Sequence, residues 1–253
     1  MRSTLLYSLQ ALLERTYRME TGIGDLAAFV IGDEGYRVLY GAVRPGPASH
    51  PPESVGAARR GFPGLVMEDR AAAVGSGVAA EGARVLVRES SGSVAARIYY
   101  PDALIRRLEQ CPPARGLTDA NIDAFATFVE ELDHFLLLAE RVRLRRSVTL
   151  LELEMHANVT KYLVCALFRA AGRVDGRKAP LPAEDRLWLY WHLFEKITFA
   201  EPDPRVQARY RAASRFARRF LGGLDEAPSP AARLERLRLF HDATHEQKLA
   251  ALA

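Results

Sequence analysis

The sequence predicts an α+β protein, with a small N-terminal part made of two antiparallel hairpins and helices, followed by a helical C-terminal bundle. Two observations predict the hairpins: residues 26–40 and 83–99 each contain two β-prone runs around a turn-forming sequence. A third predicts the bundle, because almost every stretch beyond the Pro-rich break at 111–116 has apolar residues at helical spacing. We therefore divide the chain at this break into parts spanning 1–112 and 113–253.

The first hairpin is predicted from residues 26–31 and 36–40, which flank the sequence Gly-Asp-Glu-Gly. The second is predicted from residues 83–89 and 93–99, which flank Ser-Ser-Gly. Residues 45–64, between the two hairpins, are rich in Pro, Gly and Ala and are expected to form a loop.

Helices are predicted where apolar residues recur every three to four positions. The sequence Thr-Leu-Leu-Glu at 149–152 has the pattern of a capping box, which predicts where one of them begins. The helices at 119–145 and 149–171 each carry two apolar faces, a pattern typical of buried helices. We expect these two helices to form a helical hairpin at the centre of the core. The predicted helices span 3–18, 119–145, 149–171, 183–197, 204–221 and 230–252.

The composition is that of a soluble globular protein. Hydrophobic residues make up 49% and charged residues 26%, which excludes a disordered chain. No apolar run is long enough to span a bilayer, and the N-terminus does not resemble a signal peptide. Cys111 and Cys165 form no metal or redox motif and fit reduced thiols, so we expect a cytoplasmic protein. The net charge of +4 is slight and argues against a nucleic-acid partner.

A polar cluster interrupts the predicted helix at 119–145. Glu130 and His134 lie one turn apart, and Glu131 stands three residues before His134. Leu137 and Leu138 follow on the polar side, so the helix is apolar nearly all round just past the cluster and should be buried. A buried carboxylate must be paired, protonated or bound to a cation. The cluster is therefore a candidate site.

The next helix carries a related polar line between two apolar faces. Glu154, Asn158 and Lys161 recur on this line at spacings of four and three, and His156 lies on a flank. In a tight antiparallel hairpin of the two helices, Lys161 is level with Glu131. We therefore predict that Lys161 and Glu131 lie within ion-pairing reach.

Two further histidines lie near the C-terminus. His241 falls on the apolar stripe of the predicted helix at 230–252 and is expected to point inward. His245 follows four residues later, and two histidines at this spacing on one helix can bind the same metal ion.

Residues 129–135, Val-Glu-Glu-Leu-Asp-His-Phe, resemble the active-site helix of zincin metallopeptidases, whose pattern is H-E-x-x-H. In this resemblance Glu130 takes the place of the first histidine ligand, Glu131 that of the general base and His134 that of the second ligand. In the gluzincin branch a glutamate of the next helix completes the site, and Glu154 lies twenty residues after His134. The resemblance implies a zinc-dependent hydrolase.

Ferritin-like di-iron proteins offer a second metal interpretation. Glu131 and His134 fit their E-x-x-H unit, which is normally joined by a second such unit and two more glutamates. The sequence supplies Glu154 and His156 for such a site. Iron and manganese therefore stay open beside zinc.

Two functions of different class remain. One is a metal-dependent enzyme, most plausibly a hydrolase of unknown substrate, in which Glu131 activates water as general base and His241 supplies a proton. The other is a non-enzymatic helical module that binds a protein partner and whose buried polar network is structural. The candidate metal ligands of the first are Glu130, His134, Glu154 and His156.

Overall fold

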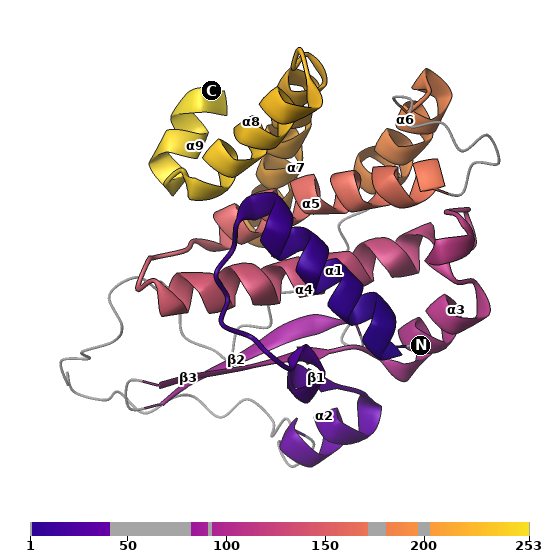
Figure 1. Ribbon diagram of the computed structural model, residues 1–253. Coiled ribbons are helices and arrows are strands. Elements are labelled where there is room, and N and C mark those ends of the chain that lie inside the picture. The colour runs from indigo at the N-terminus through magenta and orange to yellow at the C-terminus, as the bar shows by residue number, and fades with distance from the viewer. Residues whose placement is uncertain (1, 41–81, 91–92, 172–180, 197–202, 253) are drawn as a thin grey trace.

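The computed structural model describes residues 2–40, 82–90, 93–171, 181–196 and 203–252 of the 253-residue chain. The loop predicted at 45–64 lies outside these residues. Figure 1 shows a small sheet on one side of helix α4 (Ile122–Arg143) and helix α5 (Leu150–Ala171) on the other. The later helices lie beyond α5. The α+β class is thereby confirmed.

The described strands form one mixed three-stranded sheet with the order β1-β3-β2. Strands β2 (Arg84–Ser90) and β3 (Ser93–Tyr99) pair antiparallel, which confirms the second predicted hairpin. The short strand β1 (Val30–Ile31) pairs parallel with β3, with Val30 opposite Ile98. Both β2 and β3 contact α4, so the sheet covers one side of that helix.

The first predicted hairpin, at residues 26–40, is wrong. This segment forms a 3₁₀ turn at Leu26–Phe29, the strand β1 and the helix α2 (Asp33–Tyr40). The Asp-Glu-Gly sequence that suggested a turn suits the first turn of a helix equally well, because carboxylates there interact favourably with the helix dipole. The Tyr99 hydroxyl also donates to Asp33 Oδ1 over 2.8 Å and fixes the start of α2 against the sheet.

The antiparallel pair α4 and α5 is the centre of the core, as predicted. Every residue from 128 to 138 and from 152 to 162 is buried, so both helices are enclosed on all sides over these stretches. The Thr149 hydroxyl accepts a hydrogen bond from the main-chain N–H of Glu152 over 3.1 Å, which confirms the predicted start of α5. Cys165 lies on α5 with no exposed surface and belongs to the hydrophobic core.

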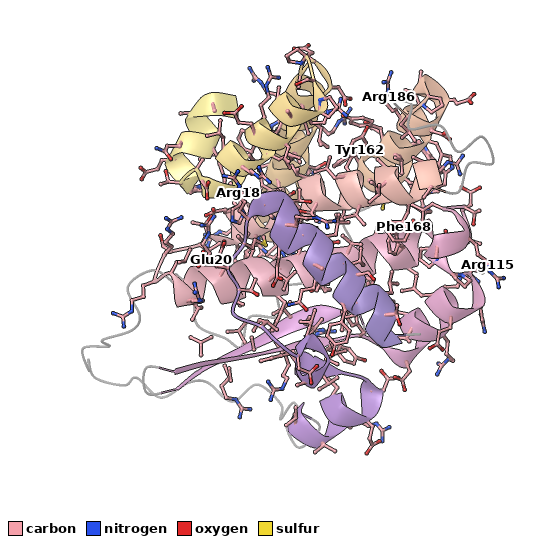
Figure 2. All side chains as sticks on the ribbon, in the orientation of Figure 1. Arg18, Glu20, Arg115, Tyr162, Phe168 and Arg186 are labelled. Carbon is pink, nitrogen blue, oxygen red and sulfur yellow. The ribbon has the colours of Figure 1, made fainter. Side chains whose placement is uncertain are left out.

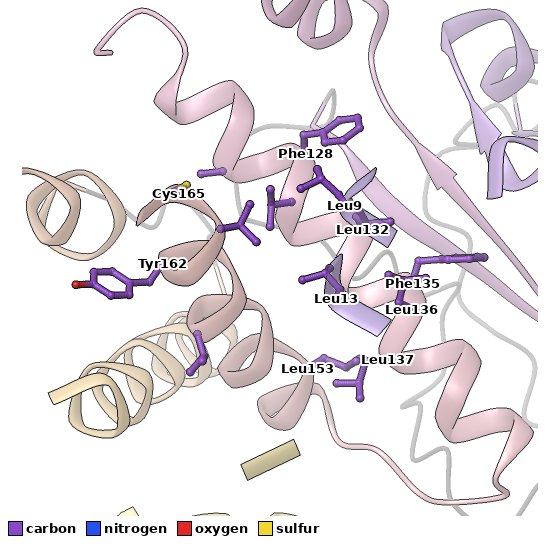
Figure 3. Packing of buried hydrophobic residues seen from close by; sticks show 14 of the residues in the cluster. Leu9, Leu13, Phe128, Leu132, Phe135, Leu136, Leu137, Leu153, Tyr162 and Cys165 are labelled. Atoms are coloured by element: carbon purple, nitrogen blue, oxygen red, sulfur yellow. The ribbon is translucent and has the colours of Figure 1, made fainter. Parts of the chain in front are cut away.

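Helix α1 (Arg2–Tyr17) is confirmed and crosses α4 (Figure 1). Figure 3 shows Leu9 and Leu13 of α1 beside Leu132 and Leu136 of α4, and all four side chains are buried. Because α1 also contacts the C-terminal helix α8 (Pro230–Asp242), the hydrophobic core is continuous from the N-terminal helix to the C-terminal bundle.

The chain after α1 returns along the end of α4. Figure 2 shows Arg18 and Glu20 just beyond the end of α1, and Glu20 Oε2 forms an ion pair with Arg143 over 3.0 Å. Helix α3 (Asp102–Gln110) follows β3 and packs on α4. This helix was not predicted from the sequence. Elements on several sides therefore hold α4 in place.

The C-terminal part contains α6 (Ala183–Tyr190) with a π-helical turn at Trp191–Glu195, then α7 (Pro204–Asp225), which packs on α5. These elements match the helices predicted at 183–197 and 204–221, with α7 running four residues further. No helix among the residues described is both long and apolar enough to cross a membrane.

The single helix predicted at 230–252 is wrong, because the chain breaks into α8 and α9 (His245–Leu252). Thr244 and Gln247 cause the break by forming a capping box. The Thr244 hydroxyl accepts from the Gln247 N–H over 3.2 Å, and Gln247 Oε1 accepts from the Thr244 N–H over 2.8 Å. His241 and His245 therefore lie on different helices, and the helical spacing expected for a shared metal ion is absent.

Candidate metal centre

Three of the four predicted metal ligands meet between α4 and α5. Glu130 and His134 lie one turn apart on α4, and Glu154 reaches them from α5. One carboxylate or imidazole ligand atom from each residue lies within 4.8 Å of the others. The exposed fractions of Glu130, His134 and Glu154 are 6%, 1% and 2%, so the group is enclosed by protein.

Among the residues that the structure describes, the imidazole of His134 has no hydrogen-bond partner on either ring nitrogen, although it is buried. Its Nε2 lies 3.9 Å from Oε2 of Glu154, too far for a hydrogen bond. Burial lowers the pKa of His134, so the ring is neutral and a nitrogen lone pair is available to a cation. A buried polar group without a partner costs about 1–3 kcal/mol, and a bound cation would remove that cost.

The carboxylates of this group are destabilised by one another. Burial, followed by the negative charge of Glu130, raises the pKa of Glu154 to about 8. The charges of Lys161 and of Arg209 on α7 act in the opposite direction without cancelling this shift. Without a cation, Glu154 therefore holds a proton at neutral pH, and a metal ion would take the place of that proton.

Glu131 is a fourth buried acid beside the group. Burial raises its pKa well above the ordinary range, and the charges of Glu130 and Glu154 add to the effect. Neither carboxylate oxygen has a hydrogen-bond partner of ordinary geometry in the described part of the chain, although the N–H of Val85 on β2 is close enough to lower the pKa in part. Without a bound cation, Glu131 thus favours its protonated form, and it is a buried acid next to the three potential ligands.

The predicted ion pair between Lys161 and Glu131 is wrong, because the acidic partner of Lys161 is Glu130. Lys161 Nζ lies 3.0 Å from Oε2 of Glu130. Successive residues of a helix point about 100° apart, so only one of the two neighbouring glutamates faces α5. Glu130 faces Lys161, whereas Glu131 is turned toward β2 and Val85.

His156 belongs to a second buried network on the other side of the two helices. Its Nδ1 lies 2.8 Å from Oδ2 of Asp133, and its Nε2 lies 3.1 Å from Nδ1 of His241. The Nε2 of His241 lies 2.8 Å from Oε2 of Glu140, close enough for an ion pair, but the two groups are not aligned for a hydrogen bond. Both nitrogens of His156 are therefore occupied, and the structure does not bring His156 to the candidate metal centre.

The same contacts place His241 away from Glu131. As predicted, His241 points inward and is only 1% exposed, but its neighbours are His156 and Glu140. His245 contacts the Thr149 hydroxyl through Nδ1 over 3.2 Å. The predicted role of His241 as a proton donor at the metal centre thus has no contact in the structure to support it.

The acidic members of this second network were not predicted from the sequence. Burial alone would raise the pKa of Asp133, but the charge and hydrogen bond of His156, with a hydrogen bond from Thr160, lower it. The Tyr17 hydroxyl lies 2.9 Å from the Thr160 hydroxyl and links α1 to the network. Asp133, which stands directly beside His134, was the available sequence signal for a second polar face on α4.

A neighbouring ion-pair group joins α4, α5 and α9. Lys248 Nζ lies 2.6 Å from Oε1 of Glu152, and Arg141 Nη2 is 3.5 Å from the same oxygen. Arg141 also donates to the carbonyl oxygen of His241 over 2.7 Å. The buried charges of this ion-pair group are paired, in contrast to the side chains of His134 and Glu131. The ion-pair group therefore has the character of a structural network.

No protein-family model matches the chain, and no match to it was found among the curated proteins or the solved structures. Glu130, His134 and Glu154 lie close enough together to hold a metal ion, and the ring nitrogens of His134 have no hydrogen-bond partner within the described part of the chain.

Proposed function

We propose that this protein is a metal-dependent hydrolase whose divalent ion is bound by Glu130, His134 and Glu154. The observation that carries the proposal is the buried, unpartnered imidazole of His134 within 4.8 Å of two carboxylates. Two carboxylates and one imidazole suit zinc, iron or manganese, and three protein ligands leave a coordination position for water, as in catalytic zinc sites. Zinc is the ion that the zincin resemblance favours.

The charges around the group also favour a cation. Glu130, Glu131 and Glu154 are three buried carboxylates, and the Lys161 ammonium pairs with only one of them. Arg209 offsets part of the remaining charge on Glu154. A divalent ion would allow the carboxylates to ionise without leaving an excess of buried negative charge.

Glu131 is the residue that we assign as general base. It is adjacent to the ligand Glu130 in sequence, and neither of its oxygens is engaged by another side chain among the described residues. Burial raises its pKa in the metal-free protein, and a divalent ion bound nearby would favour the ionised form that can accept a proton. A metal ion bound beside it would polarise water or a substrate carbonyl. Glu131 would then accept the proton that the attacking water loses.

One observation favours the alternative function, a non-enzymatic helical module that binds a protein. The buried ion pair between Lys161 and Glu130 joins α4 to α5 and engages one oxygen of a proposed ligand. Buried ion pairs of this kind can specify how two helices pack, without any role in catalysis.

An activity assay on matched variants distinguishes the two functions. Zinc-loaded protein is expected to hydrolyse members of a library of fluorogenic peptides or nitrophenyl esters. Glu131→Gln should lower the rate by about 10²–10⁴, the usual contribution of a general base, while the metal content stays the same. Glu235→Gln changes an exposed glutamate of α8 and should have native activity. Native activity in Glu131→Gln, or no hydrolysis by the metal-loaded protein, would favour the structural alternative.

A further inference from the structure

A groove is lined by residues of α7, α8 and α9. Figure 1 shows these three helices on the side of α5 away from the sheet. Its volume is about 660 Å³, within the range of about 300–1,000 Å³ that is typical of small-molecule sites. It shares no lining residue with the candidate metal centre. The groove is thus a separate feature with the size of a ligand site.

The groove has a continuous apolar wall. Phe220 of α7 and Phe240 of α8 stack within it, with ring centroids 4.3 Å apart. Leu224 continues the wall on α7 and Leu239 on α8. Leu239 is 64% exposed although it is a large apolar side chain, so a ligand that covered it would remove apolar surface from water.

The charged residues around this wall are mostly cationic. Arg219 and Arg236 are exposed and line the groove from α7 and α8, and Asp242 is the acidic lining residue. Lys248 also lines the groove, but its ammonium is paired with Glu152 over 2.6 Å. Arg219 and Arg236 are thus exposed cations at the edge of the groove, where an anion from solvent can approach them.

One of these guanidinium groups is held in place by the fold. Arg236 Nη1 donates to the carbonyl oxygen of Gly223, which also lines the groove. A guanidinium group presents several N–H donors in a plane and binds carboxylates through paired hydrogen bonds. A carboxylate at this position would lie at the edge of the apolar wall.

We infer that this groove binds an amphipathic carboxylate with a single apolar chain, of the fatty-acid type. The chain lies along Phe220, Leu239 and Phe240, and the carboxylate meets Arg219 and Arg236. Net positive charge beside an apolar surface selects this ligand over a neutral or cationic molecule of the same length. The inference does not depend on a metal ion at Glu130, His134 and Glu154.

Calorimetric titration with three ten-carbon probes tests the chemistry of the ligand. Decanoate is expected to bind the full chain, and 1-decanol should bind at least about fivefold more weakly because it lacks the charge. Decyltrimethylammonium should bind more weakly still. Equal affinity for decanoate and decanol, or tighter binding of the cationic probe, would overturn the proposed ligand class.

Substitutions at two neighbouring glycines test whether decanoate binds in this groove. A Cβ atom at either Gly222 or Gly223 meets no atom within 4 Å, so both positions accept a side chain. Only Gly223 lines the groove. Gly223→Leu is therefore expected to fill the groove and weaken decanoate binding at least about tenfold, whereas Gly222→Leu should bind as the native protein does. Equal binding by both variants would contradict the location.

Arginine variants test the head-group contact without altering the apolar wall. Arg236→Gln and Arg219→Gln should each weaken decanoate binding by up to about fivefold, the effect of one exposed charge pair, and leave decanol binding unchanged. Arg215→Gln changes an exposed arginine one turn earlier on α7 that does not line the groove, and it serves as the control. Native decanoate affinity in both groove variants would contradict the proposed contact between the carboxylate and these arginines.

Discussion

Replacing Leu132 with Asp is expected to abolish soluble expression. Leu132 has no exposed surface and lies at the middle of α4, where Figure 3 shows it beside Leu9 of α1. An unpaired carboxylate there would cost several kcal/mol, a large part of the about 5–15 kcal/mol by which proteins are usually stable. The measurement is the yield of soluble protein, followed by circular dichroism of any that is recovered.

The matched control for this variant is Leu187→Asp. Leu187 lies on α6 and is 70% exposed, so the same substitution there introduces a charge into solvent. It should express at the native level. If Leu132→Asp also expressed and unfolded at the native temperature, the burial of α4 described above would be wrong.

The central helical hairpin could be predicted because α4 and α5 are apolar on more than one face, a pattern that only a buried helix shows. The helix α2 and the break between α8 and α9 could not be predicted from hydrophobic spacing alone. In both places short polar sequences decide the structure, through the acidic first turn of α2 and the capping box of Thr244 and Gln247.

The candidate site could be predicted only in part from the sequence. Spacing along one helix predicts that Glu130 and His134 share a face, and the structure places them together with Glu154. Glu154 and His156 are two residues apart, so they point about 200° apart around α5 and do not reach the same site. Which of them would face Glu130 depends on the rotation of α5 about its axis. That rotation is set by packing with α4 and α7, which the sequence pattern does not contain.

Binding of a divalent metal ion at pH 7 is expected to release about one proton from the ligands, and a second proton when Glu131 ionises as the general base. Burial raises the pKa of Glu154 to about 8 in the metal-free protein, so its carboxyl group must lose a proton to become a ligand. The pKa of His134 is lowered, so this ligand is already neutral at pH 7 and releases none. Affinity should therefore fall at least about tenfold for each pH unit below 8, since at least one proton competes with the metal.

Titration of chelator-treated protein with zinc, in two buffers of different ionisation enthalpy, measures the number of protons released. The difference between the two apparent binding enthalpies should correspond to between about one and about two protons per zinc ion at pH 7, from Glu154 and Glu131, and to fewer above pH 8. Binding that released no proton and did not vary with pH would show that Glu154 is not a ligand.

Elemental analysis of purified protein tests the metal centre most directly. Native protein prepared without chelator, with zinc, iron and manganese each offered in turn, is expected to carry about one equivalent of metal. His134→Ala should carry none, whereas His245→Ala, which alters a histidine at the start of α9, should carry the native amount. A native protein that retained none of the three metals, or a His134→Ala variant that retained as much as the native protein, would contradict a metal centre at Glu130, His134 and Glu154.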